Sequence, residues 1–220
     1  MESLEIPLDF EVLQSQNPTE QPSSAVFFLH GYGANELDLS SLSRHFPSDI
    51  FIISLRAPFP LSSGYCWYPI NLSPTGEIPD QPEPDSLNQS IDLINKSRDA
   101  VIELYNLEPH KIGLLGFSQG TILSLSLLCK SPSDYSWCIG FSGYLPTSFF
   151  NSSHAGLLNK PVFLSAGIAD ELIPLHKIDK TKKKLEELGC DVTFSSHPGG
   201  HYIEQSTLME LQQWISKHVP

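Results

Sequence analysis

Short apolar runs alternate along the chain with longer segments in which apolar residues recur every three or four positions. The short runs are apolar almost throughout, which is typical of strands covered on both faces. Their alternation with helices predicts βα units and a mostly parallel sheet. The expected strands are Ala25–Leu29, Ile50–Ser54, Lys111–Leu115, Trp137–Phe141, Pro161–Ala166 and Val192–Ser196.

Four segments have the apolar spacing of helices. Ser86 and Gln89 have the spacing of a capping box, which predicts the start of the first helix. The segment Gln119–Lys130 is apolar nearly all round, so this helix should be largely buried. Gly189 is in the position where a glycine ends a helix, directly after the third expected helix. The apolar stripes of the other helices are Leu87, Ile91, Ile94, Val101 and Tyr105, then Leu175, Ile178, Leu185 and Leu188, then Leu208, Leu211, Trp214, Ile215 and His218.

One interval, Arg56–Asp85, does not follow this alternation and is rich in Pro, Gly, Ser and aromatic residues. A long stretch without regular structure inside a compact domain is usually functional or flexible. No repeat or linker divides the rest of the chain, and 220 residues suffice for a sizeable core. We therefore expect one domain over residues 1–220, with substrate selection in this interval.

The charge of the chain limits the classes of binding partner that can be expected. The net charge is −12, and the basic run Lys180–Lys184 is followed directly by Glu186 and Glu187, which is typical of a solvated helix face. We expect no nucleic-acid partner and no stable membrane association, and homodimer formation is left open. The N-terminus does not resemble a secretory signal, and the four cysteines are scattered without C-x-x-C spacing. This pattern predicts reduced thiols, no metal site and a cytoplasmic protein.

Candidate chemistry begins with Gly116-Phe-Ser-Gln-Gly120, which lies between an expected strand and an expected helix. A Gly-x-Ser-x-Gly pattern alone is weak, but a strand before it and a helix after it are what a nucleophile elbow requires. The two glycines relieve crowding in the tight turn and leave Ser118 exposed at the helix N-terminus. The pattern therefore predicts Ser118 as a nucleophile, the alternative being an ordinary βα turn.

A serine nucleophile needs a base and an orienting acid, which follow it in this order: serine, acid, histidine. Asp170 and His201 each follow a later expected strand and fit that order. His197 competes with His201 but immediately ends its strand, whereas Gly199 and Gly200 let the loop carry His201 back over the site. The alternatives to Asp170 are Glu171, one residue out of register, and Asp179, within a helix.

The oxyanion of such a reaction needs backbone donors. Leu29-His-Gly-Tyr-Gly33 closes an early strand with a glycine-flanked turn, so the N–H of Tyr32 is one expected donor. The N–H of Gln119, directly after the nucleophile, is the other. His30 follows its strand directly and is expected to buttress the turn rather than act as a base.

The sequence resembles the phospholipase/carboxylesterase family of α/β hydrolases. The resemblance runs from about residue 25 to 203 and rests on the oxyanion turn, Arg56-Ala-Pro with the later Gly64-Tyr-Cys-Trp-Tyr68, the elbow, Gly167-Ile-Ala-Asp170 and Gly199-Gly-His201. It implies an α/β-hydrolase fold and ester or thioester hydrolysis without cofactor or metal, with Ser118, Asp170 and His201 as the triad. Many relatives have His-Gly before the acid loop, where this chain has Ser165-Ala-Gly. Tyr32 stands where a smaller aliphatic residue is frequent in the thioesterases.

The resulting expectation is a serine carboxylesterase for short- to medium-chain esters. Four aromatic residues of the Arg56–Asp85 interval are expected either to line the substrate pocket or to stabilise their loop: Phe59, Tyr65, Trp67 and Tyr68. The rival activities are acyl-protein thioesterase or lysophospholipase, and aminopeptidase chemistry on the same triad. A rival of another class is a non-catalytic ligand-binding protein of the same fold.

Overall fold

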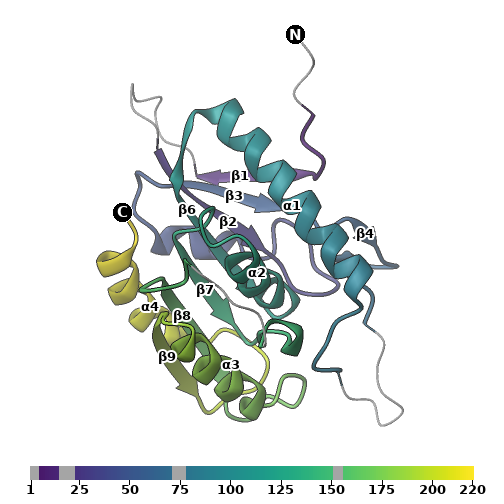
Figure 1. Cartoon of the computed structure of the whole chain (residues 1–220), viewed down its shortest axis with the longest axis vertical. Helices are drawn as coiled ribbons and strands as arrows, with labels where there is room; N and C mark the ends of the chain where they lie inside the picture. Colours follow the sequence, from purple (N-terminus) through teal and green to yellow (C-terminus); the bar gives the residue numbers. More distant parts are fainter. Residues whose placement is uncertain (1–4, 15–22, 71–77, 151–155) are drawn as a thin grey trace.

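The computed structural model describes residues 5–14, 23–70, 78–150 and 156–220. A seven-stranded sheet forms the centre, in the order β1-β3-β2-β6-β7-β8-β9 (Figure 1). All neighbouring strands are parallel except β1, which lies antiparallel to β3 at one edge. The strands are β1 Phe10–Gln14, β2 Ser23–Leu29, β3 Phe51–Leu55, β6 Leu107–Phe117, β7 Trp137–Phe141, β8 Pro161–Gly167 and β9 Asp191–His197. All six expected strands are present.

Two features were not expected. Strand β1 is only partly buried, so it lacks the uninterrupted apolar run that marks the inner strands. The interval Arg56–Asp85 contains a small antiparallel hairpin formed by β4, Phe59–Pro60, and β5, Tyr65–Cys66. The expectation that this interval has no regular structure is therefore wrong for these residues, and residues 71–77 lie outside the described part.

The four expected helices are α1 Pro84–Tyr105, α2 Gln119–Lys130, α3 Leu175–Glu187 and α4 Gln205–His218, and two short 3-10 helices, η1 Ser40–His45 and η2 Thr147–Phe149, accompany them. The prediction that a capping box at Ser86 starts the first helix is wrong. Helix α1 begins at Pro84, and the carboxylate of Glu83 accepts hydrogen bonds from the N–H groups of Asp85 and Ser86 at 3.0 and 2.8 Å. Proline fits the first helical position, so the helix starts earlier than the serine pattern predicts.

The core has two layers, one on each face of the sheet. Helices α1, α2 and α3 cover one face, and η1 and α4 cover the other (Figure 1). Strand β2 shows how the sequence builds both layers: Phe27 and Leu29 pack on the first side, while Val26 and Phe28 pack on the second. Successive side chains of a strand point to opposite faces, so a strand buried on both sides is apolar throughout.

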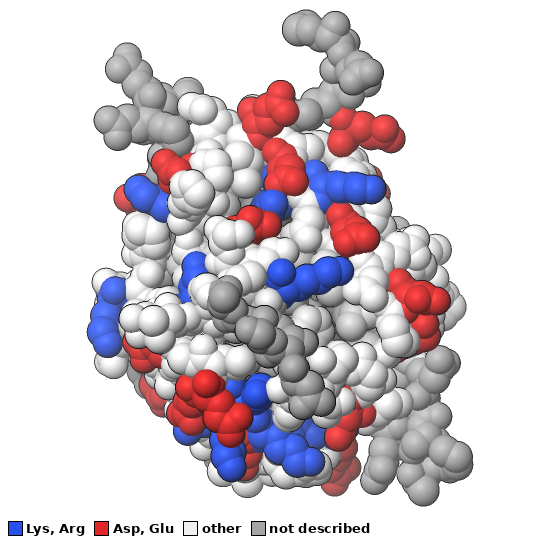
Figure 2. Space-filling model, in the orientation of Figure 1, with Lys and Arg blue, Asp and Glu red and all other residues white. Residues whose placement is uncertain are grey.

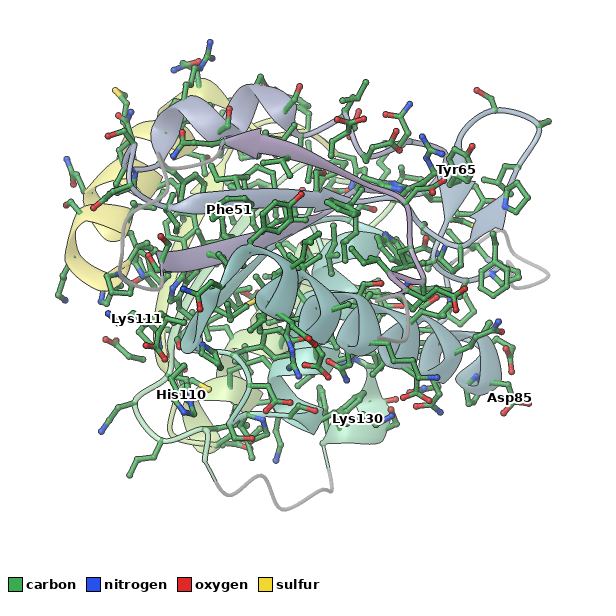
Figure 3. The ribbon with its side chains drawn as sticks, turned by 90° about the horizontal axis from the view of Figure 1, so that it is seen from above. Phe51, Tyr65, Asp85, His110, Lys111 and Lys130 are labelled. Carbon is green, nitrogen blue, oxygen red and sulfur yellow. The ribbon has the colours of Figure 1, made fainter. Side chains whose placement is uncertain are left out.

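The parallel strands direct their following loops to one edge of the sheet. In the view from above, Phe51 and Lys111 near the strand starts lie at one end of the molecule, and Tyr65 and Asp85 lie at the opposite end (Figure 3). Ligands of open parallel sheets bind beyond the carboxyl ends of the strands. The loops after β2, β6, β8 and β9 therefore converge where a site is expected.

The surface of α3 accounts for the basic run in the sequence. Lys182 pairs with Glu186 at 2.9 Å and Lys184 with Glu187 at 3.6 Å. On the face shown in Figure 2, Lys and Arg side chains are interspersed with Asp and Glu. Across the described residues, no helix has both the length and the apolar character needed to cross a bilayer.

Candidate active site

Ser118 occupies the turn between β6 and α2 with φ +53° and ψ −114°. This conformation is rare for a residue with a side chain and costs roughly 1–3 kcal/mol, so the surroundings must hold it in place. One contribution is the hydrogen bond from the N–H of Ser118 to the carbonyl of Phe141 at 2.8 Å. Another is the close approach of Gly120 to β2, where an added Cβ would lie 1.8 Å from the carbonyl oxygen of Leu29. The elbow therefore requires glycine at this position.

The structure brings Ser118, His201 and Asp170 into one line of hydrogen bonds. Oγ of Ser118 lies 2.9 Å from Nε2 of His201, and Nδ1 of His201 lies 2.7 Å from Oδ2 of Asp170. A proton on Nδ1 of His201 then donates to the carboxylate, and Nε2 can accept the serine proton. The other carboxylate oxygen of Asp170 accepts the N–H groups of Leu172 and Ile173 at 2.9 and 2.8 Å. The buried carboxylate is thus fully hydrogen-bonded and fixes the histidine ring.

The competing residues lie apart from this line. His197 is buried at the end of β9, with its ring against Tyr202 at 5.2 Å, and its Nδ1 has no partner among the described residues. Glu171 is exposed on the wall of a pocket, and Asp179 is exposed on α3. The geometry therefore favours His201 and Asp170 over each alternative.

His30 supports the turn that follows β2. Its Nδ1 donates to the carbonyl of Gly31 at 2.7 Å, and its Nε2 accepts the N–H of Ala57 at 3.1 Å. Burial lowers the pKa of His30, which favours the neutral ring that can both donate and accept. This arrangement matches the buttressing role expected from the sequence.

The two expected oxyanion donors lie beside Ser118 on different elements. Gln119 is the first residue of α2, and the first N–H groups of a helix have no partner within it. Tyr32 and Gly31, in the turn after β2, line the same pocket as Ser118 and His201. Both residues thus adjoin the position that a substrate carbonyl would occupy.

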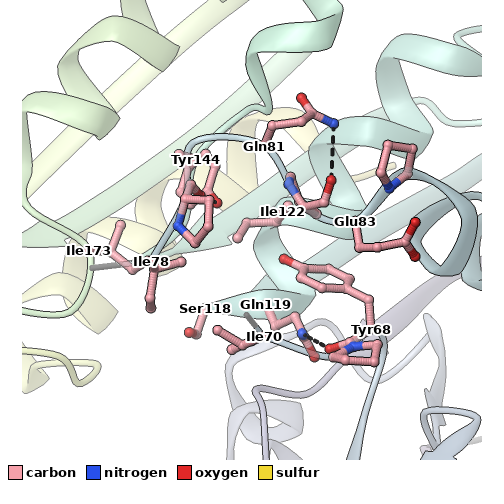
Figure 4. A pocket seen from close by; sticks show the side chains of 14 residues that line it. Tyr68, Ile70, Ile78, Gln81, Glu83, Ser118, Gln119, Ile122, Tyr144 and Ile173 are labelled. Atoms are coloured by element: carbon pink, nitrogen blue, oxygen red, sulfur yellow. Dashed lines mark hydrogen bonds between the residues drawn. The ribbon is translucent and has the colours of Figure 1, made fainter. Parts of the chain in front are cut away.

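Two pockets meet at Ser118. The smaller, of ≈ 290 Å³, is mostly apolar, and the larger, of ≈ 1290 Å³, also contains His201 and several charged groups. Ile70, Ile78 and Pro79 line both and therefore lie along their boundary. Figure 4 shows Ile70 and Ile78 beside Ser118 in the smaller pocket. The nucleophile candidate thus faces an apolar cavity on one side and a more polar one on the other.

Of the four aromatic residues expected in the pocket, only Tyr68 is among the residues lining either one. Trp67 is wholly buried and its indole N–H donates to the carbonyl of His30 at 2.9 Å. Tyr65 and Phe59 belong to the hairpin, and the guanidinium of Arg56 lies 5.0 Å from the Tyr65 ring centroid. The pocket alternative is therefore wrong for Phe59, Tyr65 and Trp67, and their contacts fit the other alternative, support of the loop.

Sequence reasoning missed most of the residues that line the apolar pocket. The lining side chains come from separate segments and include Ile70, Ile78, Ile122, Tyr144 and Ile173. They share no spacing along the chain. The prolines at 79, 82 and 84, which shape one wall, are the only local signal that the sequence offered.

Comparison with known proteins places the chain in a family. A family model described as Phospholipase/Carboxylesterase matches residues 11–219. The chain belongs to this family.

The relatives of this phospholipase/carboxylesterase family member include esterases and thioesterases. A probable carboxylesterase of Arabidopsis thaliana is 25% identical over 93% of this chain and 82% of its own. An acyl-protein thioesterase 1 of Aspergillus fumigatus is 34% identical over 52% of this chain and 50% of its own. These relatives and the family match support an esterase function for this chain and its assignment to the serine hydrolases.

The fold of this family member is also found among solved structures. A Bacillus cereus carboxylesterase superposes with a TM-score of 0.83 at 21% identity, covering 96% of this chain and 94% of the other. The likeness confirms the α/β-hydrolase fold expected from the sequence.

Proposed function

We propose that this chain is a serine carboxylesterase that hydrolyses short- to medium-chain carboxylic esters through an acyl-enzyme. The observation that carries the proposal is the line of hydrogen bonds from Ser118 through His201 to the buried Asp170. This line lies at the carboxyl edge of a parallel sheet, beside an apolar pocket. A nucleophile, a base and an orienting acid in contact are the parts that acyl transfer needs.

The proposed reaction has two halves. Nε2 of His201 takes the proton of Ser118 as Oγ attacks the ester carbonyl, and the N–H groups of Tyr32 and Gln119 stabilise the oxyanion. His201 then protonates the leaving alcohol, and in the second half it activates the water that releases the acid. Asp170 holds the histidine tautomer and stabilises the imidazolium throughout.

The pockets suggest which part of the substrate lies where. The apolar pocket, lined by isoleucines and prolines, suits the acyl chain. Its ≈ 290 Å³ lies at the lower end of ordinary small-molecule sites, roughly 300–1,000 Å³, which favours short and medium chains. The larger pocket suits the alcohol. Lys177 offsets the charge of Asp80 at 2.8 Å, and the remaining carboxylates of Asp38 and Glu171 disfavour anionic leaving groups.

Covalent labelling with a fluorophosphonate tests the nucleophile. The wild-type chain should be labelled and the Ser118→Ala variant should not. Ser133→Ala, which changes an exposed serine in the turn after α2, should be labelled normally. Labelling that persists in Ser118→Ala would contradict the assignment of Ser118 as the nucleophile. Complete absence of turnover on activated esters would favour the non-catalytic ligand-binding alternative.

The names of the thioesterase relatives favour one further candidate, an acyl-protein thioesterase or lysophospholipase activity. A series of nitrophenyl esters of increasing acyl length separates the two. A maximum at acyl chains of roughly eight carbons or more would favour the second candidate, since long chains need a longer apolar cavity.

A further inference from the structure

The side chain of Gln119 is buried and hydrogen-bonds to the backbone of residues 67 and 68. Its Oε1 accepts the N–H of Trp67 at 2.8 Å. Its Nε2 donates to the carbonyl of Tyr68 at 2.8 Å, the dashed line between these two residues in Figure 4. A side-chain amide is the group that can accept and donate at adjacent atoms in this way. Gln119 thereby joins the start of α2 to the segment that follows the β4–β5 hairpin.

The connection continues from Trp67 to the turn after β2. The indole N–H of Trp67 donates to the carbonyl of His30 at 2.9 Å. The His30 ring in turn bonds the carbonyl of Gly31 and the N–H of Ala57. A continuous path therefore leads from the Gln119 side chain to residues 30 and 31, immediately before Tyr32.

The ends of this path carry the two proposed oxyanion donors. One is the N–H of Gln119 itself and the other is the N–H of Tyr32, on an element far away in the sequence. Such donors act only when both lie about 2.7–3.1 Å from the same oxygen, so a small change in their separation weakens the site. A rigid link between α2 and the β2 turn would hold that separation constant.

We propose that the side chains of Gln119, Trp67 and His30 are positioning residues that set the spacing of the two oxyanion donors. This inference rests on the proposed function. Trp67 and His30 do not line either pocket at Ser118, so they act through the turn and not on the substrate. Trp67, for which the sequence left pocket lining and loop support as alternatives, thereby acts on the geometry of the site from outside the pocket.

Two single variants break the path at different bonds. Trp67→Phe removes the indole N–H but keeps an aromatic ring, and Gln119→Glu replaces the donor to the Tyr68 carbonyl with a carboxylate oxygen. Trp137→Phe is a matched control, because Trp137 is equally buried and its indole N–H has no hydrogen-bond partner among the described residues.

Steady-state kinetics on a short-chain nitrophenyl ester should show a loss in kcat of about 10-fold or more for Trp67→Phe and Gln119→Glu, with KM changed less than about twofold. Complete loss of one donor costs about 100- to 1,000-fold, which sets the upper limit. A trifluoromethyl ketone, which forms a tetrahedral oxyanion on the serine, should bind more weakly by the same factor as kcat/KM falls. Trp137→Phe should leave both readouts unchanged.

The double variant adds a test that general destabilisation does not pass. Both changes break the same path, so the double variant Trp67→Phe/Gln119→Glu should have about the same kcat as the less active of the two single variants. The proposal is overturned if kcat stays within about twofold, if KM rises instead, or if Trp137→Phe behaves alike. If Gln119→Glu does not fold, Trp67→Phe alone decides, and fluorophosphonate labelling of the wild type separately tests the proposed function.

Discussion

The segment from Ile78 to Gln81 borders both pockets and is held by side chains from other elements. Nζ of Lys177, on α3, donates to the carbonyl of Ile78 at 2.6 Å and pairs with Asp80 at 2.8 Å. The hydroxyl of Tyr144 donates to the carbonyl of Pro79 at 2.6 Å. We predict that Lys177→Met, which keeps much of the apolar stem and removes the ammonium, loosens this segment and enlarges the apolar pocket.

The size of the effect follows from the contacts that are lost. A hydrogen bond from a charged donor contributes about 1.5–3 kcal/mol. The Lys177 side chain is only 12% exposed, so water compensates little, whereas Asp80 is 47% exposed and its ion pair adds less. A loss of about 2 kcal/mol would raise the population in which the segment is detached about 30-fold.

Two measurements report on this change. Limited proteolysis within Ile78–Gln81 should become faster by about that factor, because cleavage follows the population of the detached state, and the preferred acyl length in the nitrophenyl ester series should increase. Lys183→Met is the control, because Lys183 is exposed on the same helix and forms no ion pair among the described residues. An unchanged rate of proteolysis together with an unchanged acyl preference in Lys177→Met would refute the reasoning.

Two predictions concern stability. Gly120→Ala should prevent folding or lower Tm by many degrees, because its Cβ would meet the Leu29 carbonyl at 1.8 Å, whereas Gly200→Ala, whose nearest neighbour is 3.5 Å away, should be tolerated; equal melting temperatures would contradict this. Glu36→Gln should lower the free energy of unfolding by about 1–3 kcal/mol at pH 7, because the buried carboxylate accepts two hydrogen bonds from Arg56. Those hydrogen bonds lower the pKa of Glu36 below 4.5, so its contribution is complete above that pH and is lost as the pH falls through the lowered value. Urea unfolding should show the difference between wild type and variant narrowing at low pH, and a constant difference from about pH 3 to 7 would argue against this account.

The sheet and the line of candidate catalytic residues could both be predicted from the sequence, because both follow from the pattern of the inner strands. Inner strands must be apolar on both faces, and their parallel direction brings residues after β6, β8 and β9 together in chain order. Edge strand β1 carries no such pattern, because Glu11 faces solvent. The helix start at Pro84 was missed because a glutamate acted as the cap in place of the expected serine.

The pocket could not be derived in the same way. Trp67 and Tyr68 are neighbours of similar character and both are buried in the core, yet only Tyr68 also lines the apolar pocket. The indole of Trp67 donates to the carbonyl of His30, a partner that lies 37 residues away. Periodicity contains no information about such a partner, so the lining of a loop-built pocket depends on the tertiary structure.

The unusual backbone of Ser118 has an evolutionary consequence. A left-handed residue with a Cβ stores free energy that a glycine at the same position would release. A glycine, which would relieve this strain, would also remove the proposed nucleophile. Selection for heat resistance alone would drive the chain toward an inert protein, and only selection for turnover keeps a serine there.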